Sequence, residues 1–261
     1  MSAVTEWDAE EYALISGLQS AMAAEVLALV ELNSTERVLD VGCGAGKITA
    51  AIASQVSQGA VVGVDPSEEM IGYAAKHFAP PAYPNIKFQV ADARQLSFRD
   101  EFDLIVSFNA LHWVPEQGAA LAAISAALKP NGRAQLRLVS KGERKSLEET
   151  IEDTRLASTW SHYFPGFSKP FLHLTPEQYT ATAERNGLDV LRADAVLKAW
   201  DFKTRSAFEK FGSVTFAAWT QVLPDDLKIP FVSDVLDRYL SAGDGNVFHY
   251  YQMDVTAKRR I

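Results

Sequence analysis

The sequence predicts an α/β protein built on a doubly wound, mostly parallel sheet. Short apolar runs alternate with amphipathic segments between residues 37 and 139, and strands that alternate with helices form parallel βαβ units. A glycine-rich turn, Gly42-Cys-Gly44-Ala-Gly46, directly follows the first apolar run. Such a turn lies at the carboxyl edge of the sheet, where open α/β sheets bind ligands.

Seven strands and several helices can be placed from these patterns. The predicted strands are Arg37–Val41, 60–64, 85–90, Phe102–Phe108, 133–139, 188–200 and 248–257. The predicted helices are 9–32, 45–56, 67–78, 117–128, one from Thr175-Pro176 to about Asn186-Gly187, and pieces of 208–239 that break at Pro224 and Pro230. Lys129-Pro-Asn-Gly132 predicts a turn, and the segment 141–174 is mixed and rich in aromatic residues.

Composition argues against several classes of protein. The net charge of −8 over 261 residues gives no basic footprint for nucleic acid, and only Lys258-Arg-Arg260 forms a basic cluster. The single cysteine, Cys43, excludes an intrachain disulfide and a zinc site built from cysteines. No apolar run reaches about 18 residues, and no signal peptide is recognisable. We expect a cytoplasmic monomer or weak homodimer with no metal, nucleic-acid or membrane partner.

The spacing of the glycines separates three kinds of nucleotide site. A P-loop needs Ser or Thr after its Gly-Lys pair, but Ile48 follows Lys47. A dinucleotide loop needs Gly-x-Gly-x-x-Gly, and Lys47 stands where its third glycine would be. The shorter spacing suits a ligand held through an amino acid group and a ribose, such as S-adenosylmethionine. A tight turn without a ligand is the alternative.

Acidic residues occur at the ends of the first three predicted strands. Asp65 ends the second strand, where a carboxylate can accept both ribose hydroxyls, although Asp65-Pro66 also resembles a helix N-cap followed by proline. Asp40 precedes the loop and could face the ligand's ammonium group or the loop amides. Asp92 follows the third strand, where it could meet the adenine amino group or be an ordinary loop acid.

Together these segments resemble the ordered motifs of class I S-adenosylmethionine-dependent methyltransferases. The segments are Val38-Leu-Asp-Val-Gly-Cys-Gly-Ala-Gly46, Gly63-Val-Asp-Pro-Ser-x-x-Met70, Val90-Ala-Asp92, Phe102-Asp-Leu-Ile-Val-Ser-Phe-Asn-Ala-Leu-His-Trp113 and Leu128-Lys-Pro-Asn-Gly132. The resemblance implies a Rossmann-like sheet with an α-helical cap, S-adenosyl-L-methionine as cofactor and S-adenosyl-L-homocysteine as product. It also implies a cofactor site lined by Gly42, Gly44, Asp65, Pro66, Met70, Asp92, Ala93 and Asn109, which Tyr12 and Gln19 would close.

A weaker resemblance is to the small-molecule branch that contains trans-aconitate, malonyl-carrier-protein and juvenile hormone acid methyltransferases. It is carried by Trp7, Tyr12, Gln19, Leu111-His-Trp113, Phe164-Pro-Gly-Phe167, Trp219, Tyr239 and Phe248. It implies O-methylation of a small carboxylic acid or hydroxyl, with C- or N-methylation as the near alternative. A non-catalytic binder of the cofactor and a nicotinamide-linked oxidoreductase are the alternatives from other classes.

The residues beside the transferred methyl group are harder to predict. His112 follows the fourth strand and is the best-placed candidate for a general base, although it could equally pack or shape the substrate. His162, His173 and His249 belong to the predicted cap. The expected substrate-binding residues are aromatic, and most of them could instead form the core of the cap: Trp113, Trp160, Tyr163, Phe164, Phe167, Trp219 and Tyr250.

These expectations divide the chain into three parts. Residues 1–35 would form a helical lid and 36–140 the S-adenosylmethionine-binding core. Residues 141–261 would supply the remainder of the sheet, at about 175–200 and 247–258, together with helical insertions that cap the substrate.

Overall fold

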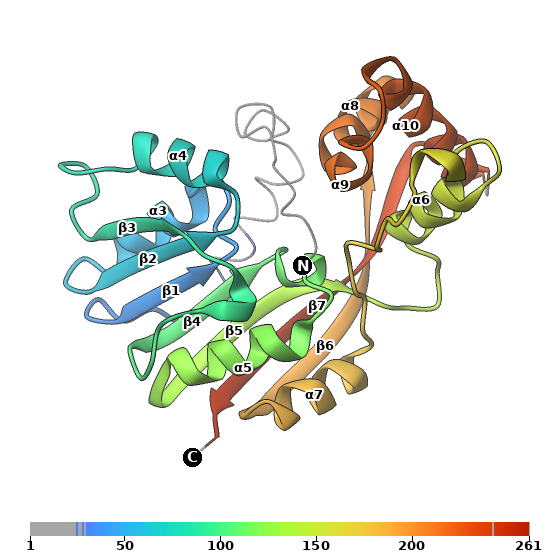
Figure 1. Ribbon diagram of the computed structural model, residues 1–261. Helices are drawn as coiled ribbons and strands as arrows, with labels where there is room; N and C mark the ends of the chain where they lie inside the picture. The colour runs from blue at the N-terminus through green and yellow to red at the C-terminus, as the bar shows by residue number, and fades with distance from the viewer. Residues whose placement is uncertain (1–24, 26–27, 29, 242, 261) are drawn as a thin grey trace.

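A single seven-stranded sheet organises the computed structural model, which describes residues 25, 28, 30–241 and 243–260. The strand order is β3-β2-β1-β4-β5-β7-β6, and β7 runs antiparallel to both neighbours while the remaining pairs are parallel (Figure 1). The strands are β1 (Arg37–Val41), β2 (Ala60–Asp65), β3 (Ile86–Val90), β4 (Phe102–Phe108), β5 (Leu128–Ser140), β6 (Leu188–Asp201) and β7 (Val247–Arg259). The predicted doubly wound, mostly parallel sheet is confirmed.

Helices cover both faces of this sheet because successive strand residues point to opposite sides. On one face, α5 (Gln117–Ala127) and α7 (Pro176–Arg185) pack on a core that includes Leu39. On the other face, α3 (Lys47–Gln55) packs on a core that includes the neighbouring residue Val38. The helix α4 (Glu68–His77) follows β2, and the short 3-10 helices η1 (Ala93–Gln95) and η2 (Leu111–Trp113) follow β3 and β4.

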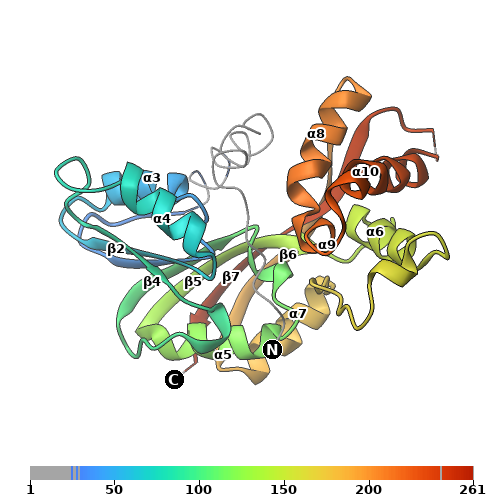
Figure 2. The same ribbon diagram turned by 45° about the horizontal axis from the view of Figure 1, so that its top comes forward.

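A second group of helices, the cap, is joined to the far ends of β6 and β7. Pairing between β5 and β7 ends at Ser140 and Tyr251, whereas β6 and β7 stay paired as far as Asp201 and Val247. The two long strands therefore project beyond the sheet as a ribbon that reaches the cap (Figures 1 and 2). The cap consists of α6 (Leu147–Leu156), η3 (Ser161–Tyr163), α8 (Arg205–Thr215), α9 (Ala217–Thr220) and α10 (Asp225–Leu240).

The cap has its own core, in which two buried indoles are tied to carboxylates. Trp219 is fully buried, and its Nε1–H donates to Glu152 Oε1 at 2.6 Å. Trp160 donates in the same way to Asp234 Oδ2 at 2.6 Å. A buried N–H without a partner destabilises a fold, so these two hydrogen bonds allow the indole rings to be buried in the core of the cap.

Several predicted boundaries need correction. The capping box of Ser146 and Glu149 begins α6, a helix that the mixed composition of 141–174 concealed. Pro224 directly precedes α10 as predicted, but Pro230 lies inside this helix and does not break it. Proline has no N–H, so one hydrogen bond of the helix is missing at Pro230. The helix continues because side chains directly after Pro230 are buried: Phe231, Val232, Val235 and Leu236.

Two other differences concern β5 and the N-terminal helix. Residues 129–132 belong to β5 as a bulge, because the register jumps from Phe102–Leu128 to Leu104–Arg133, and Asn131 has a φ of 66°. Turn residues thus produce an interruption within a strand. Most of the predicted helix 9–32 lies outside the described residues; Glu25 and Ala28 are helical, whereas the chain is no longer helical from residue 30.

Candidate functional site

The glycine loop between β1 and α3 has a backbone that only small residues allow. Gly42 and Gly44 have φ values of 75° and 49°, in the left-handed region that side chains disfavour. A Cβ atom on Gly42 would lie 2.1 Å from the Cβ of Ala110, so Gly42 lets the loops after β1 and β4 touch. A Cβ on Gly44 would have no protein atom within 4 Å among those compared with it. Gly44 therefore faces open space that a ligand can enter.

Asp65 connects this loop to the following helix. Its Oδ2 accepts the Gly44 amide at 2.9 Å, and its Oδ1 accepts the Ser67 amide at 3.0 Å. The N-cap of α4 is Ser67, whose hydroxyl accepts the Met70 amide at 3.2 Å, so the cap role suggested for Asp65 was wrong. A carboxylate offers about four acceptor positions. Asp65 can therefore organise the loop and also accept ribose hydroxyls.

Asp40 is buried directly below the loop. It is 2% exposed, and its Oδ2 accepts the Thr49 hydroxyl at 2.7 Å. Burial raises the pKa of Asp40 to about 7; the hydrogen bond from Thr49 opposes this rise, and the nearby charge of Asp65 adds to it. A cationic partner, such as the ammonium group of an amino acid, would stabilise the ionised form of Asp40, which burial disfavours.

This titration predicts pH-dependent binding of S-adenosylhomocysteine. Since the ionised form of Asp40 faces an ammonium group best, affinity should fall about tenfold in all as the pH drops from 8 to 6, with most of the fall below pH 7. Calorimetric titration at several pH values measures this slope. Asp40→Asn should bind more weakly at pH 8 and show a flat profile. A wild-type profile that is equally flat would contradict the role of Asp40.

The same raised pKa has a consequence for the stability of the protein without ligand. Between pH 4 and 7 the folded protein keeps a proton on Asp40 that the unfolded chain releases. The contribution of Asp40 to stability therefore decreases as pH rises through this window.

Asp92 lies at the end of β3 and has a protein partner. Its carboxylate caps η1 by accepting the Arg94 amide at 2.8 Å and forms an ion pair with the Arg94 guanidinium, which also reaches Glu116 at 2.8 Å. Hydrogen bonding to Arg94 holds the pKa of Asp92 below its usual value. Contact with adenine stays a prediction. No spacing rule identifies Arg94 as this partner from the sequence alone.

The remaining predicted cofactor residues are spread along the same edge. Asn109 follows β4 with a φ of 56°, and its Oδ1 accepts from Gln252 Nε2 at 3.2 Å. Pro66 is exposed, whereas Met70 and Ala93 are buried. Tyr12 and Gln19 lie outside the described residues, and their roles stay predictions.

His112 lies on η2, next to the end of β5. It is 4% exposed, and its Nδ1 accepts the Val139 amide at 3.4 Å. The His173 ring lies 5.9 Å away, centroid to centroid. Burial, with the neighbouring His173, sets the pKa of His112 well below its ordinary value. The structure thus places beside the sheet edge a histidine that is uncharged at neutral pH.

The predicted aromatic substrate residues all belong to one cluster. Trp160, Phe164, Trp219 and Tyr250 are buried in the cap core, and the others pack against it with partial exposure: Trp113, Tyr163 and Phe167. Their contact with substrate stays a prediction, and the partly exposed members are the better candidates.

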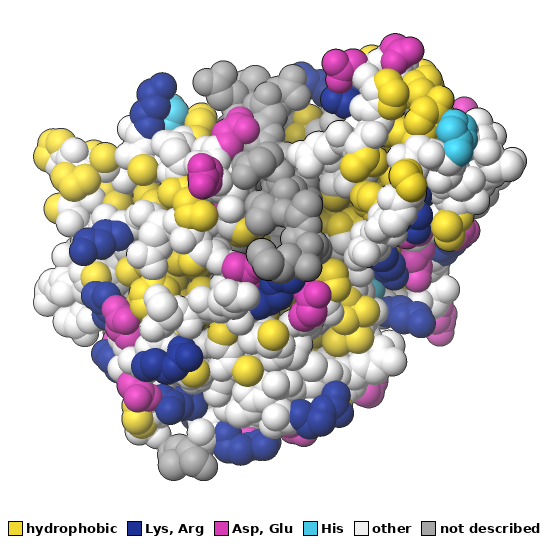
Figure 3. Space-filling model, viewed as in Figure 1, with side chains coloured by type: hydrophobic (Ala, Val, Ile, Leu, Met, Phe, Trp, Pro, Cys, Tyr) yellow, Lys and Arg dark blue, Asp and Glu magenta, His cyan; other side chains and the backbone are white. Residues whose placement is uncertain are grey.

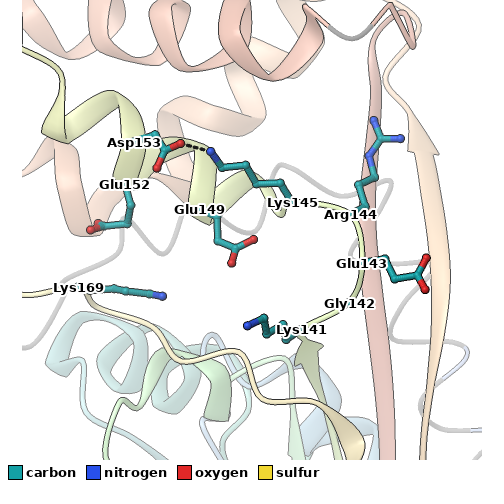
Figure 4. A pocket seen from close by; sticks show the side chains of 9 residues that line it. All are labelled: Lys141, Gly142, Glu143, Arg144, Lys145, Glu149, Glu152, Asp153 and Lys169. Carbon is teal, nitrogen blue, oxygen red and sulfur yellow. Dashed lines mark hydrogen bonds and ion pairs between the residues drawn. The ribbon is translucent and has the colours of Figure 1, made fainter.

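A charged hollow of about 470 Å³ lies where the end of β5 meets the cap (Figure 4). Lys141, Lys169 and Glu149 point toward its centre. Within the described part of the chain, neither lysine has a carboxylate partner, although Lys169 Nζ lies 4.0 Å from the centre of the Phe171 ring. Three pairs of charges include other residues of its wall: Lys145 with Asp153, Arg144 with Asp244, and Glu152 with Arg155. No pattern in the sequence marks this hollow, because its residues come from separate segments.

The surface bears no large cluster of one charge on the face in Figure 3, where Lys and Arg side chains alternate with Asp and Glu. Among the helices that the structure describes, none is long and apolar enough to span a membrane. The described residues also contain no group of three metal-ligating side chains.

Comparisons with known proteins indicate a methyltransferase domain. Residues 38–132 match a family described as methyltransferase domain. Over 241 residues, the chain is 27% identical to a protein described as a methyltransferase, 235L, of Invertebrate iridescent virus 6; the match covers 92% of this chain and 88% of that protein. It is 33% identical to the trans-aconitate 2-methyltransferase of Deinococcus radiodurans over 126 residues, or 48% of this chain and 46% of the relative. That match therefore spans about half of each protein.

A solved structure shows the same fold with the cofactor bound. The phosphoethanolamine N-methyltransferase 2 of Haemonchus contortus, in complex with S-adenosyl-L-methionine, has a TM-score of 0.62 at 18% identity, over 97% of this chain and 57% of that one. At that identity the likeness concerns the fold. The matched domain, however, contains the glycine loop, Asp40, Asp65 and Asp92. Residues 38–132 are therefore a methyltransferase domain, and the chain resembles the class I S-adenosylmethionine-dependent methyltransferases.

Proposed function

We propose that this enzyme methylates an oxygen atom of a small organic acid. The observation that carries the proposal is the charged hollow below the cap, where Lys141 and Lys169 point to the same centre as Glu149 and form no ion pair among the described residues, while the Glu149 carboxylate accepts the Ser146 amide. Ammonium groups in a concave surface attract anions and disfavour cationic substrates. The relatives named as trans-aconitate 2-methyltransferases support an acidic substrate, although they match only about half of the chain.

The residues of the sheet edge fit the cofactor. Gly44 leaves open space beside the loop, Asp65 offers acceptors for ribose hydroxyls, and Asp40 offers a carboxyl group for an ammonium group. When bound, S-adenosylmethionine supplies a methyl group already activated by a positive sulfur. The chain then has to align an acceptor oxygen with that methyl group and exclude water. The cap, whose core packs on the ribbon of β6 and β7, would cover the acceptor.

Transfer of a labelled methyl group to a panel of compounds tests this proposal. The panel contains trans-aconitate and other mono-, di- and tricarboxylic acids, each with a matched neutral alcohol and a matched amine. We expect label in methyl esters of one or more acids and at least 100-fold less in the alcohols and amines. Transfer chiefly to nitrogen or carbon would favour the alternative acceptors, and binding of cofactor without transfer to any compound in a metabolite extract would favour a non-catalytic role.

Substitutions of the two lysines test whether the acid that the panel identifies binds in the hollow. Lys141→Ala and Lys169→Ala together should raise KM for the best acid about tenfold or more, because two favourable charges are lost, and leave the affinity for S-adenosylhomocysteine unchanged. Lys210→Ala, an exposed lysine of α8 outside the hollow, is the matched control. An unchanged KM in the double variant would remove the hollow from the substrate site.

A further inference from the structure

We infer that His112 and His173 form an uncharged pair that holds the acceptor as N–H donors, and that the accepting group is a carboxylate already ionised before it binds. This inference rests on the proposed function and specifies how the acceptor is recognised. It replaces the predicted general base at His112 with a hydrogen-bond donor.

The surroundings of His112 select one tautomer of its ring. The Val139 amide points its hydrogen at Nδ1 across 3.4 Å in a buried position. If Nδ1 carried the proton, two donors would face each other there without water to separate them. A neutral imidazole has one N–H, so the proton resides on Nε2. His112 therefore presents an N–H donor through Nε2, and its lone pair is directed at the main chain.

The charge state of the pair follows from its neighbours. No carboxylate forms an ion pair with His112 among the described residues, and the group acting on it electrostatically is His173. His173 faces Glu149, which favours its protonation, and Lys169, which opposes it; burial outweighs both and lowers the pKa of His173 to about 4. Both rings are thus neutral at the pH values, around neutrality, at which carboxylic acids are ionised.

Main-chain hydrogen bonds fix the positions of the two rings. The Leu172 amide donates to the His112 carbonyl at 2.9 Å, which joins η2 to the segment that carries His173. The Gln117 side chain donates to the carbonyls of Leu111 at 3.3 Å and Leu172 at 2.8 Å. The rings are therefore held by the scaffold rather than by each other, as a preformed recognition site requires.

His173 is the observation that points to a ligand. It is 7% exposed, and both of its ring nitrogens are buried without a hydrogen-bond partner among the residues that the structure describes. Buried polar atoms are nearly always satisfied, so such a ring calls for a partner that arrives with substrate. The centroids of the two rings lie 5.9 Å apart, close enough for one carboxylate lying alongside both rings to accept from each.

The chemistry of the donor pair selects the acceptor. A hydroxyl or an amine must give up a proton during methylation, and His112 as held here cannot take it, since Nε2 is already protonated and Nδ1 faces an amide. A carboxylate gives up none: its oxygen forms the new bond to the methyl carbon, the carbon–sulfur bond breaks, and the electron pair of that bond stays with sulfur. No proton moves, and no base is needed.

Nitrogen-15 NMR of the histidine rings tests the tautomer without any substrate. The signals of His112 are assigned by their disappearance in His112→Gln. We expect the neutral Nε2–H form between pH 6 and 8. An Nδ1–H tautomer or an imidazolium ion in this range would overturn the inference. Because this measurement needs no turnover, it is independent of the panel that tests the proposed function.

Kinetics with the acid that the panel identifies provide the second test. Glutamine retains a donor near the Nε2 position but has no basicity. His112→Gln should therefore stay within about tenfold of wild type, whereas His112→Leu should raise KM at least 30-fold. His173→Gln and His173→Phe should show the same contrast. The control is His162→Gln, because His162 is an exposed histidine of the cap.

The pH profile completes this test. We expect kcat to be independent of pH from 6 to 9 in wild type and in His112→Gln. Equal losses in His112→Gln and His112→Leu, with a wild-type kcat that rises with pH, would show a general base and refute the donor pair.

Discussion

Asp65→Ala is expected to weaken binding of S-adenosylhomocysteine by about 100-fold or more while the protein stays folded. The substitution removes the carboxylate that would accept two ribose hydroxyls, and hydrogen bonds to a charged acceptor each contribute about 1.5–3 kcal/mol. It also removes the acceptor for the amides of Gly44 and Ser67, which holds the loop against α4. Isothermal titration calorimetry measures the affinity, and circular dichroism reports whether the fold persists.

Glu68→Ala provides the matched control for this experiment. Glu68 is an exposed acid in the first turn of α4, three positions after Asp65, so the control removes one negative charge from the same region. Its affinity should remain within a few-fold of wild type. If Asp65→Ala and Glu68→Ala bind equally well, Asp65 has only a structural role in the loop.

Gly44→Ala is expected to weaken cofactor binding tenfold or more and to leave the protein folded. The new methyl group would meet no protein atom within 4 Å among those compared, so it would project into the space that we propose for the ligand. The left-handed backbone at this position adds a cost of about 1–2 kcal/mol. Melting temperature and calorimetric affinity, measured on the same sample, separate the two effects.

Gly42→Ala supplies the contrasting case. Here the added Cβ would lie 2.1 Å from the Cβ of Ala110, so the loops after β1 and β4 would have to separate. We expect a larger fall in melting temperature than for Gly44→Ala, because overpacking adds about 1–3 kcal/mol to the backbone cost. If Gly44→Ala leaves the affinity unchanged, the open space beside Gly44 is not the ligand site.

The sheet could be predicted from sequence because each strand carries a local signal. The apolar run Arg37–Val41 with the glycines directly after it, and the run of β2 that ends in Asp65, are each visible within one short segment. The helix α7 was equally clear, since Thr175, Pro176 and Gln178 form a capping box with proline in the first turn. These signals act within single elements and do not depend on what packs against them.

Other features could not be predicted because they depend on distant partners. The ring of His112 is oriented by the Val139 amide on another strand, and Asp40 acquires its raised pKa from burial that no local pattern records. The charged hollow joins Lys141 to Lys169 across α6 and η3. Pro230 shows the reverse case, in which tertiary packing overrides a strong local signal for a helix break.

We expect the carboxyl edge of β1 and β2 to bind S-adenosylmethionine through the glycine loop and Asp65. Calorimetric titration of the wild-type protein with S-adenosylhomocysteine, beside an identical titration with NAD, tests it most directly. We predict one saturable site per chain for S-adenosylhomocysteine, lost in Asp65→Ala, and no binding of NAD. Absence of S-adenosylhomocysteine binding, or saturable binding of NAD that Asp65→Ala abolishes, would contradict the claim.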